Sequence, residues 1–205
     1  MAVTGFRENA LVKLFVAILP PPQATEELAA AVRSLHALPE AAGLRWTGRP
    51  SWHLTLAFLG EVDDGALPGL ERNLAAAAAG QPGFGLRLAG GGRFGDRALW
   101  AGVGGDTAAL ARLAAAAVDA AGQAGIAADD QQFTGHLTLA RSSVPRHGGG
   151  RARHGAPGLA PFADALAGFS GEPWQVSTLR LMRSGSGPGP KSYETVASWE
   201  LPESG

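Results

Sequence analysis

The pentapeptide His-Leu-Thr-Leu-Ala occurs twice in this chain, at positions 53–57 and again at positions 136–140. In a β-strand, residues two apart point to the same side and lie about 6.5–7 Å apart along the strand. Each copy therefore predicts a strand that turns its leucines toward a core and its histidine and threonine toward a polar groove. A duplicated strand without chemistry is the alternative. Leucine would serve a buried face better than histidine, so the repeat favours a pair of working chemical groups.

The composition fits a globular chain of one large domain or two small lobes, with 205 residues of which 45% are hydrophobic. A formal net charge of −1 argues against a broad nucleic-acid footprint, which is usually strongly basic. A small phosphate pocket lined by a few arginines stays open. The chain has no cysteine, which excludes disulfides, thiolate metal sites and a cysteine nucleophile. This is compatible with a reducing compartment, and we expect a cytoplasmic protein.

Apolar spacing and turn residues predict short strands interleaved with helices. Strands are expected at 13–19, 44–46, 53–59, 84–88, 98–103, 133–141, 174–182 and 193–201. Helices are expected at 23–38 with Thr25 as N-cap, within 60–80 after a turn, and from an Asp106 cap to about 124. The glycine-rich stretch 90–95 is predicted to be a turn. The order indicates an α+β fold of two similar lobes, each with an antiparallel-type sheet and helices. We expect the lobes to be related by a pseudo-two-fold axis, with the repeated strands side by side.

The domain boundaries are predicted as a flexible N-terminal extension over 1–12 and a single bilobal domain over 13–205. The apolar run 11–19 is interrupted by Lys13 and followed by three prolines. It is therefore interpreted as a buried first strand and not as a signal peptide. No apolar run is long enough to cross a bilayer, and we expect a monomer that does not associate with membranes.

Two imidazoles and two hydroxyls in one groove suit phosphoryl chemistry. Histidine titrates near neutrality, so one imidazole can act as a base while its protonated partner acts as an acid. Threonine hydroxyls can donate hydrogen bonds to non-bridging phosphate oxygens. Neither segment carries a nearby carboxylate to complete a metal coordination shell, so no metal and no cofactor are predicted. Because the two motifs are symmetric, the spacing does not decide which histidine is the acid.

With these motifs in their wider frames, the sequence resembles the two-histidine (2H) phosphoesterases, and more closely the LigT-like bacterial RNA 2′,3′-cyclic phosphodiesterases. The segments that carry the resemblance are "KLFVAILPP", "LRWTGRPSWHLTLAFLGEV", "ALWAGV", "FTGHLTLAR" and "VSTLRLMRS…YETVASWEL". The resemblance implies a bilobal α+β fold with the two motifs facing each other across a cleft. It also implies hydrolysis of a 2′,3′-cyclic phosphate at an RNA 3′ end to a 2′-phosphomonoester.

The same resemblance implies roles for the motif residues. His53 would be the proton donor to the leaving 3′ oxygen, and His136 the proton acceptor from the attacking water. Thr55 and Thr138 would hold the phosphate. The substrate would be RNA with a 2′,3′-cyclic phosphate end or a small cyclic-phosphate nucleotide.

Several further residues are candidate substrate contacts. Arg141 lies two residues past Leu139, so a regular strand would turn it toward the core. A bend would let Arg141 reach the phosphate, as the family's matching arginine suggests, and a surface salt bridge is the alternative. Phe58, at an odd offset from the first histidine, could stack on a base or pack. Tyr193 and Trp46 have the same two interpretations.

The glycine- and arginine-rich loop 142–158 leaves the size of the substrate open. Its arginines, at positions 146, 151 and 153, could meet an RNA backbone or be solvated. The histidines at 36, 147 and 154 lack the motif context and are expected to have solvated or incidental roles. Alternatives to the hydrolase are 2′-5′ RNA end ligation by the same acid–base pair, a phosphodiesterase for small cyclic nucleotides and, from a different class, a non-catalytic RNA-end binding module.

Overall fold

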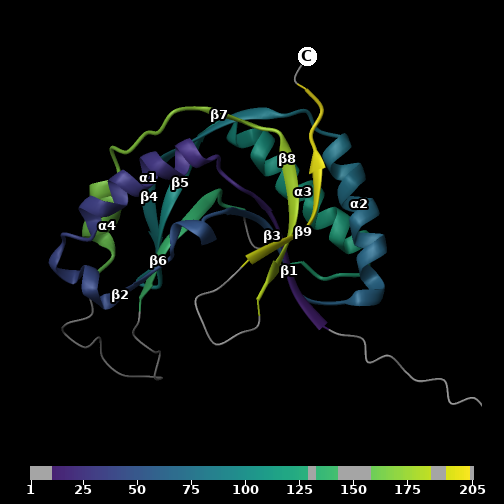
Figure 1. The fold of residues 1–205 in the computed structure, drawn as a ribbon, viewed down its shortest axis with the longest axis horizontal. Helices are drawn as coiled ribbons and strands as arrows, with labels where there is room; N and C mark the ends of the chain where they lie inside the picture. The colour runs from purple at the N-terminus through teal and green to yellow at the C-terminus, as the bar shows by residue number, and fades with distance from the viewer. Residues whose placement is uncertain (1–10, 129–132, 143–157, 186–192, 204–205) are drawn as a thin grey trace, which may run out of the picture.

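The computed structural model describes residues 11–128, 133–142, 158–185 and 193–203 (Figure 1). The first ten residues of the predicted N-terminal extension lie outside this part. So do residues 143–157, which include Arg146, Arg151, Arg153 and both loop histidines. The first strand begins at Leu11, two residues before its predicted start.

Two antiparallel sheets form the molecule, as the sequence predicts. The first sheet has the strand order β3 (Leu54–Asp63), β1 (Leu11–Ile18), β8 (Thr178–Ser184) and β9 (Tyr193–Glu200). The second sheet has the order β2 (Leu44–Trp46), β6 (His136–Ser142), β5 (Ala98–Gly105), β4 (Phe84–Phe94) and β7 (Trp174–Val176). The predicted α+β architecture is confirmed.

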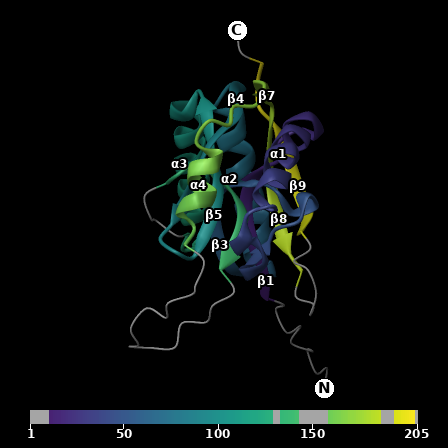
Figure 2. The same cartoon turned by 90° about the vertical axis from the view of Figure 1, so that its left-hand side faces the viewer.

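Four α-helices are found in the described part of the chain: α1 (Pro22–Leu35), α2 (Leu67–Ala79), α3 (Thr107–Gln123) and α4 (Ala160–Leu166). Helices α2 and α3 pack on each other and contact strands of the first sheet, whereas α1 and α4 contact β4 of the second sheet (Figures 1 and 2). Short 3₁₀ turns lie at Pro39–Gly43, Arg49–Ser51 and Asp64–Ala66. None of the described helices is long and apolar enough to span a bilayer.

Strand β1 is buried on both faces and separates two apolar clusters. Leu14, Val16 and Ile18 belong to the main core. Phe15 and Ala17 face the other way and form a second cluster with Met182, against which Tyr193 packs. The second cluster makes a floor on the face of the first sheet that the main core does not use.

The third predicted helix and its cap are confirmed, whereas the cap of the first helix is wrong. The Asp106 carboxylate accepts a hydrogen bond from the Ala109 N–H at 2.8 Å, as an N-cap should. The first helix starts three residues before Thr25, whose hydroxyl instead donates to the Pro22 carbonyl at 2.8 Å. Proline is well suited to the first helical position, because its missing N–H has no partner there anyway.

Three other expectations differ from the structure. Most of the glycine-rich stretch 90–95 lies within β4, and the chain turns only after Phe94. The strand predicted over 174–182 is two strands, β7 and β8, in different sheets. The short helix α4 follows the arginine-rich loop and was not predicted. Local sequence patterns do not predict these features, because each depends on packing against a segment that is distant in the chain.

Candidate functional site

The two repeated segments form corresponding strands. β3 and β6 contact each other although they belong to different sheets. All four motif leucines are buried, at 54, 56, 137 and 139. The motif histidines and threonines are half-buried and lie on the other side of their strands. The predicted burial of the motif leucines is confirmed.

Both strands carry a β-bulge at the same place in the motif. The leucine between the motif threonine and alanine, Leu56 in β3 and Leu139 in β6, has no partner of its own in the register with the neighbouring strand. A bulge shifts the alternation of side chains by one residue. The alanine that follows is therefore buried together with the leucine.

The bulges return Phe58 and Arg141, each five residues after its histidine, to the histidine side of the strand. The bulge at Leu139 supplies the bend that turns Arg141 away from the core, and the Arg141 side chain is exposed. Phe58 is 52% exposed, which argues against a packing role. The two motifs thus present an aromatic ring in one half and a guanidinium in the other.

Each imidazole is oriented by the carbonyl two residues before it. The Nδ1–H of His53 donates to the Ser51 carbonyl at 2.8 Å, and the Nδ1–H of His136 donates to the Thr134 carbonyl at 2.7 Å. A carbonyl oxygen only accepts, so Nδ1 carries the hydrogen in both rings. Nε2 is then the nitrogen of each ring that is left to accept or donate a proton.

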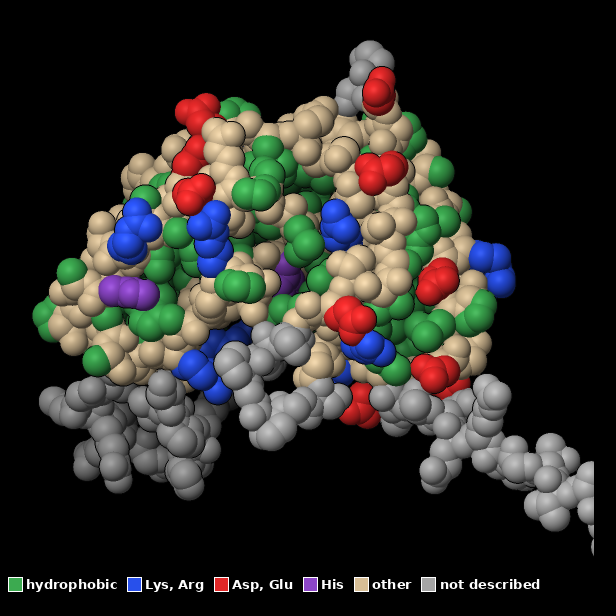
Figure 3. Space-filling view, viewed as in Figure 1, with side chains coloured by type: hydrophobic (Ala, Val, Ile, Leu, Met, Phe, Trp, Pro, Cys, Tyr) green, Lys and Arg blue, Asp and Glu red, His purple; other side chains and the backbone are tan. Residues whose placement is uncertain are grey.

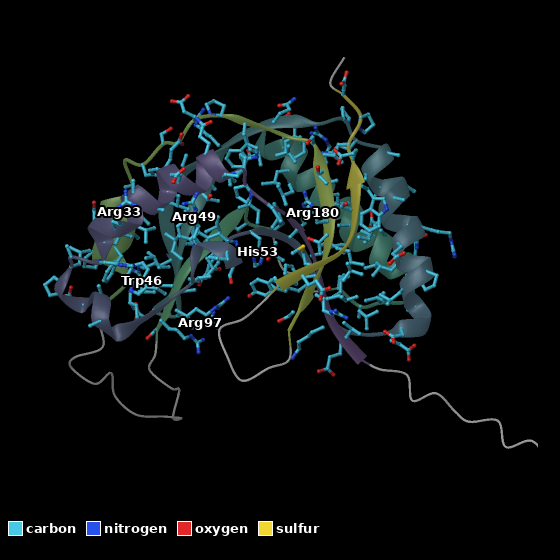
Figure 4. The ribbon with its side chains drawn as sticks, in the orientation of Figure 1. Arg33, Trp46, Arg49, His53, Arg97 and Arg180 are labelled. Atoms are coloured by element: carbon cyan, nitrogen blue, oxygen red, sulfur yellow. The ribbon has the colours of Figure 1, made fainter. Side chains whose placement is uncertain are left out.

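Around His53 the groove forms a pocket of about 240 Å³. Its lining combines aromatic rings with two polar side chains: Lys13, Phe15, His53, Phe58, Ser184 and Tyr193. The His53 ring centroid lies 4.8 Å from that of Phe15 and 4.9 Å from that of Tyr193. Figure 3 shows a hollow on this face with a histidine at its base, at the place where Figure 4 labels His53.

His136 is also flanked by two aromatic rings. Its centroid lies 4.8 Å from that of Phe94, edge to face, and 6.2 Å from that of Trp100. The indole lies over Gly92 on the neighbouring strand, where an added Cβ would come within 2.3 Å of ring carbons. Only glycine at this position leaves room for the ring beside His136.

We expect Gly92→Ala to lower the kcat of a reaction that depends on His136 by about 10–10²-fold. The reason is that the rigid indole must move, which displaces the imidazole of His136 beside it. Gly168→Ala is the matched control, since an added Cβ there meets nothing within 4 Å. Steady-state kinetics and near-ultraviolet circular dichroism of the tryptophans measure the effect. Full activity of the Gly92 variant would show that Trp100 does not position His136.

The charge of Arg141 influences the pKa values of two ring side chains, His136 and Tyr193. Burial lowers the pKa of the His136 imidazole, the Thr134 carbonyl raises it, and the Arg141 guanidinium lowers it. Burial raises the pKa of the Tyr193 phenol, and the Arg141 charge opposes that rise. Tyr193 in turn touches His53. The Arg141 charge on β6 thus acts on His136 of the second motif and on Tyr193, the ring that contacts His53 of the first motif.

Trp46 lies elsewhere. Its Nε1–H donates to the Ala41 carbonyl at 3.1 Å, and its ring lies 4.3 Å from His36 and 6.1 Å from Phe162 between centroids. The packing interpretation of Trp46 therefore holds. His36 is exposed and lies against this indole, which agrees with the solvated or incidental role predicted for it.

Comparison with known proteins shows which proteins this chain resembles. The family model described as LigT like Phosphoesterase matches residues 18–104. An RNA 2′,3′-cyclic phosphodiesterase of Geobacillus stearothermophilus is 34% identical over 160 residues, which is 76% of this chain and 47% of that relative. The chain thus spans about half the length of this curated relative.

The crystal structure of E. coli LigT complexed with 3′-AMP superposes with a TM-score of 0.72 at 28% identity, covering 94% of this chain and 99% of that one. The chain is similar in sequence and in fold to the LigT-like phosphoesterases.

A second solved LigT-like fold, TT0787 of Thermus thermophilus, has a TM-score of 0.70 at 25% identity over 93% of this chain and 98% of that one. The 2H phosphoesterase resemblance seen in the sequence is thereby confirmed. The rings that flank the LigT-like motifs, Phe15, Phe94 and Trp100, were not predicted from the sequence. The only signal for them is strand alternation, and it becomes informative only once the pairing partners are known.

Proposed function

We propose that this protein hydrolyses RNA 2′,3′-cyclic phosphate ends to 2′-phosphomonoesters, with His53 and His136 as an acid–base pair. The observation that carries the proposal is the matched geometry of the two motifs. Each strand presents an imidazole with Nδ1 bound to a carbonyl, and a threonine hydroxyl on the same face. The named activity of the Geobacillus relative and the 3′-AMP complex of LigT support this substrate chemistry.

In the proposed reaction, a water oxygen attacks phosphorus while the bond from phosphorus to the 3′ oxygen breaks. His136 Nε2 takes the proton from the water, and His53 Nε2–H gives a proton to the leaving 3′ oxygen. The hydroxyls of Thr55 and Thr138 donate to the non-bridging oxygens, where charge develops. The Arg141 guanidinium adds a positive charge on the same side of the groove.

The direction of proton transfer is supported by the environment of His136. A general base must be neutral before the reaction. Burial and the Arg141 charge both lower the pKa of His136, which favours the neutral imidazole that a general base requires. The environment of His136 thus agrees with its role as the acceptor, which leaves His53 as the donor.

The pocket beside His53 suits the terminal nucleoside. Phe58 and Tyr193 offer ring faces and edges for a base, and stacking on aromatic side chains is tolerant of base identity. Lys13 and Ser184 lie in the same lining and can hydrogen-bond to the base edge. We propose that Phe58 and Tyr193 contact the substrate in this pocket.

The direct test is to incubate the protein, in EDTA, with an oligoribonucleotide that ends in a 2′,3′-cyclic phosphate. We expect a 2′-phosphate product and full activity in the chelator. The described residues include no group of His, Asp and Glu side chains that could hold a metal ion. Tight binding without turnover would instead indicate an RNA-end binding module. Joining of the end to a 5′-hydroxyl strand would indicate ligation.

The pH profile of kcat/KM should be bell-shaped, with its acidic limb below the ordinary histidine value of 6.5. Activity falls on this limb as His136 takes up its proton, and burial and Arg141 both oppose that protonation. Arg141→Gln removes one of the two effects and should move the limb to higher pH. NMR titration of the His136 imidazole checks the shift without substrate. The same titration of Arg93→Gln, on β4 two strands away from β6, should match the wild type; a downward shift in Arg141→Gln would refute the assignment.

A further inference from the structure

Arg180 lies on the groove face of the first sheet, two strands away from the first motif. In the register of the sheet, Arg180 of β8 is directly opposite Ala17 of β1, and Ala17 is directly opposite Thr55 of β3. Residues directly opposite in antiparallel strands point to the same side of the sheet. Arg180 and Thr55 therefore project from the same face, with only a methyl group between them.

The separation is about 10 Å between the backbones, because neighbouring strands lie about 4.7–4.9 Å apart. Figure 4 shows Arg180 and Arg49 on either side of His53, and Figure 3 shows the hollow between them. Arg49 is already engaged, since its guanidinium donates to the Thr25 hydroxyl at 3.1 Å and to the Pro22 carbonyl at 3.0 Å. Arg180 is the cation on the opposite side.

No described residue forms a hydrogen bond or an ion pair with the half-buried Arg180 side chain. Arg183, on the same strand and facing the other way, pairs with Glu194. A partly buried cation without a partner is unfavourable unless an anion joins it. On the face of a groove that binds a polyanion, that anion is a phosphate.

We propose that Arg180 binds the phosphodiester that links the terminal nucleotide to the one before it, so that the protein prefers oligonucleotide ends to a mononucleoside cyclic phosphate. This inference rests on the proposed function. The reacting phosphate already has two threonine hydroxyls and the Arg141 guanidinium around it. The Arg180 backbone lies two strands further along the floor, and its long side chain can reach toward the phosphate next to the reacting one. Arg180 is thus a specificity-determining residue and takes no part in proton transfer.

The test compares adenosine 2′,3′-cyclic phosphate with the dinucleotide ApA ending in the same cyclic phosphate. In Arg180→Gln we expect kcat/KM for the dinucleotide to fall about tenfold or more, with little change for the mononucleoside. The dependence of log kcat/KM on log salt should also become shallower by about 0.7 for the dinucleotide alone. Arg183→Gln, which removes a charge from the same strand on the other face, should leave the ratio of the two substrates unchanged. Arg180→Lys should keep part of the preference.

Equal losses on both substrates would place Arg180 at the reacting phosphate and overturn the inference, as would an unchanged ratio in Arg180→Gln. Calorimetric titration with the unreactive products, adenosine 2′-phosphate and the ApA 2′-phosphate, makes the same comparison without turnover. A selective loss of dinucleotide affinity supports the subsite even if the wild type hydrolyses neither substrate, in which case only the proposed function fails.

Discussion

Replacing His136 with alanine should lower the rate of hydrolysis of an RNA 2′,3′-cyclic phosphate end by about 10²–10⁴-fold, the usual contribution of a general base. His53→Ala should lower it by a similar factor through the loss of the general acid. The two imidazoles act in one transition state, so the double variant should be little slower than either single variant. Single-turnover rates in EDTA, measured by separation of the cyclic end from the 2′-phosphate, give these factors directly.

His36→Ala is the matched control for the two histidine variants. His36 packs against Trp46 at the end of α1 and should be dispensable for turnover. Either motif variant with wild-type activity would eliminate the acid–base pair. Because both motif imidazoles are only half-buried, we expect the thermal stability of the variants to stay close to that of the wild type. A loss of rate can then be attributed to chemistry.

The second large effect is expected at the motif threonines. Thr55→Val and Thr138→Val keep the shape of each side chain and remove only the hydroxyl. Loss of a donor to a developing charge on oxygen typically costs about 10²–10³-fold in kcat, and we expect losses of this order with a smaller change in KM.

Thr178→Val is a suitable control, because the Thr178 hydroxyl donates to the exposed carboxylate of Glu200 and should not affect turnover. Rapid-quench measurements at saturating substrate separate the loss in chemistry from a loss in binding. If kcat stays constant and only KM rises, the hydroxyls bind the ground state and do not stabilise the transition state.

The strand character of the motifs and their division into two faces were predictable, because both depend only on alternation along the chain. The leucines must be buried somewhere, and a period of two places the histidine and threonine opposite them. The α+β class and the capped third helix followed from equally local signals. Trp100, Phe94 and Phe15 were not predictable as neighbours of the imidazoles, because each reaches its histidine from another strand.

The orientation of the Arg141 side chain could not be predicted from the local sequence. Regular alternation turns this side chain toward the core, and the bulge at Leu139 turns it back to the groove. A bulge arises from the fit between two strands, here β6 against β5, and one strand read alone does not contain it. The division of the segment 174–182 between two sheets has the same origin.

The sequence by itself determined that two His-Leu-Thr-Leu-Ala strands each carry an imidazole and a hydroxyl on one face, since that follows from the geometry of an extended chain. Only the tertiary structure decided what surrounds them. The register between strands set the bulges, and the bulge in β6 turned Arg141 back to the side of His136. It also set Arg180 in line with Thr55 across the small side chain of Ala17. Such relations depend on contacts between residues far apart in the chain, for which alternation within a single strand carries no information.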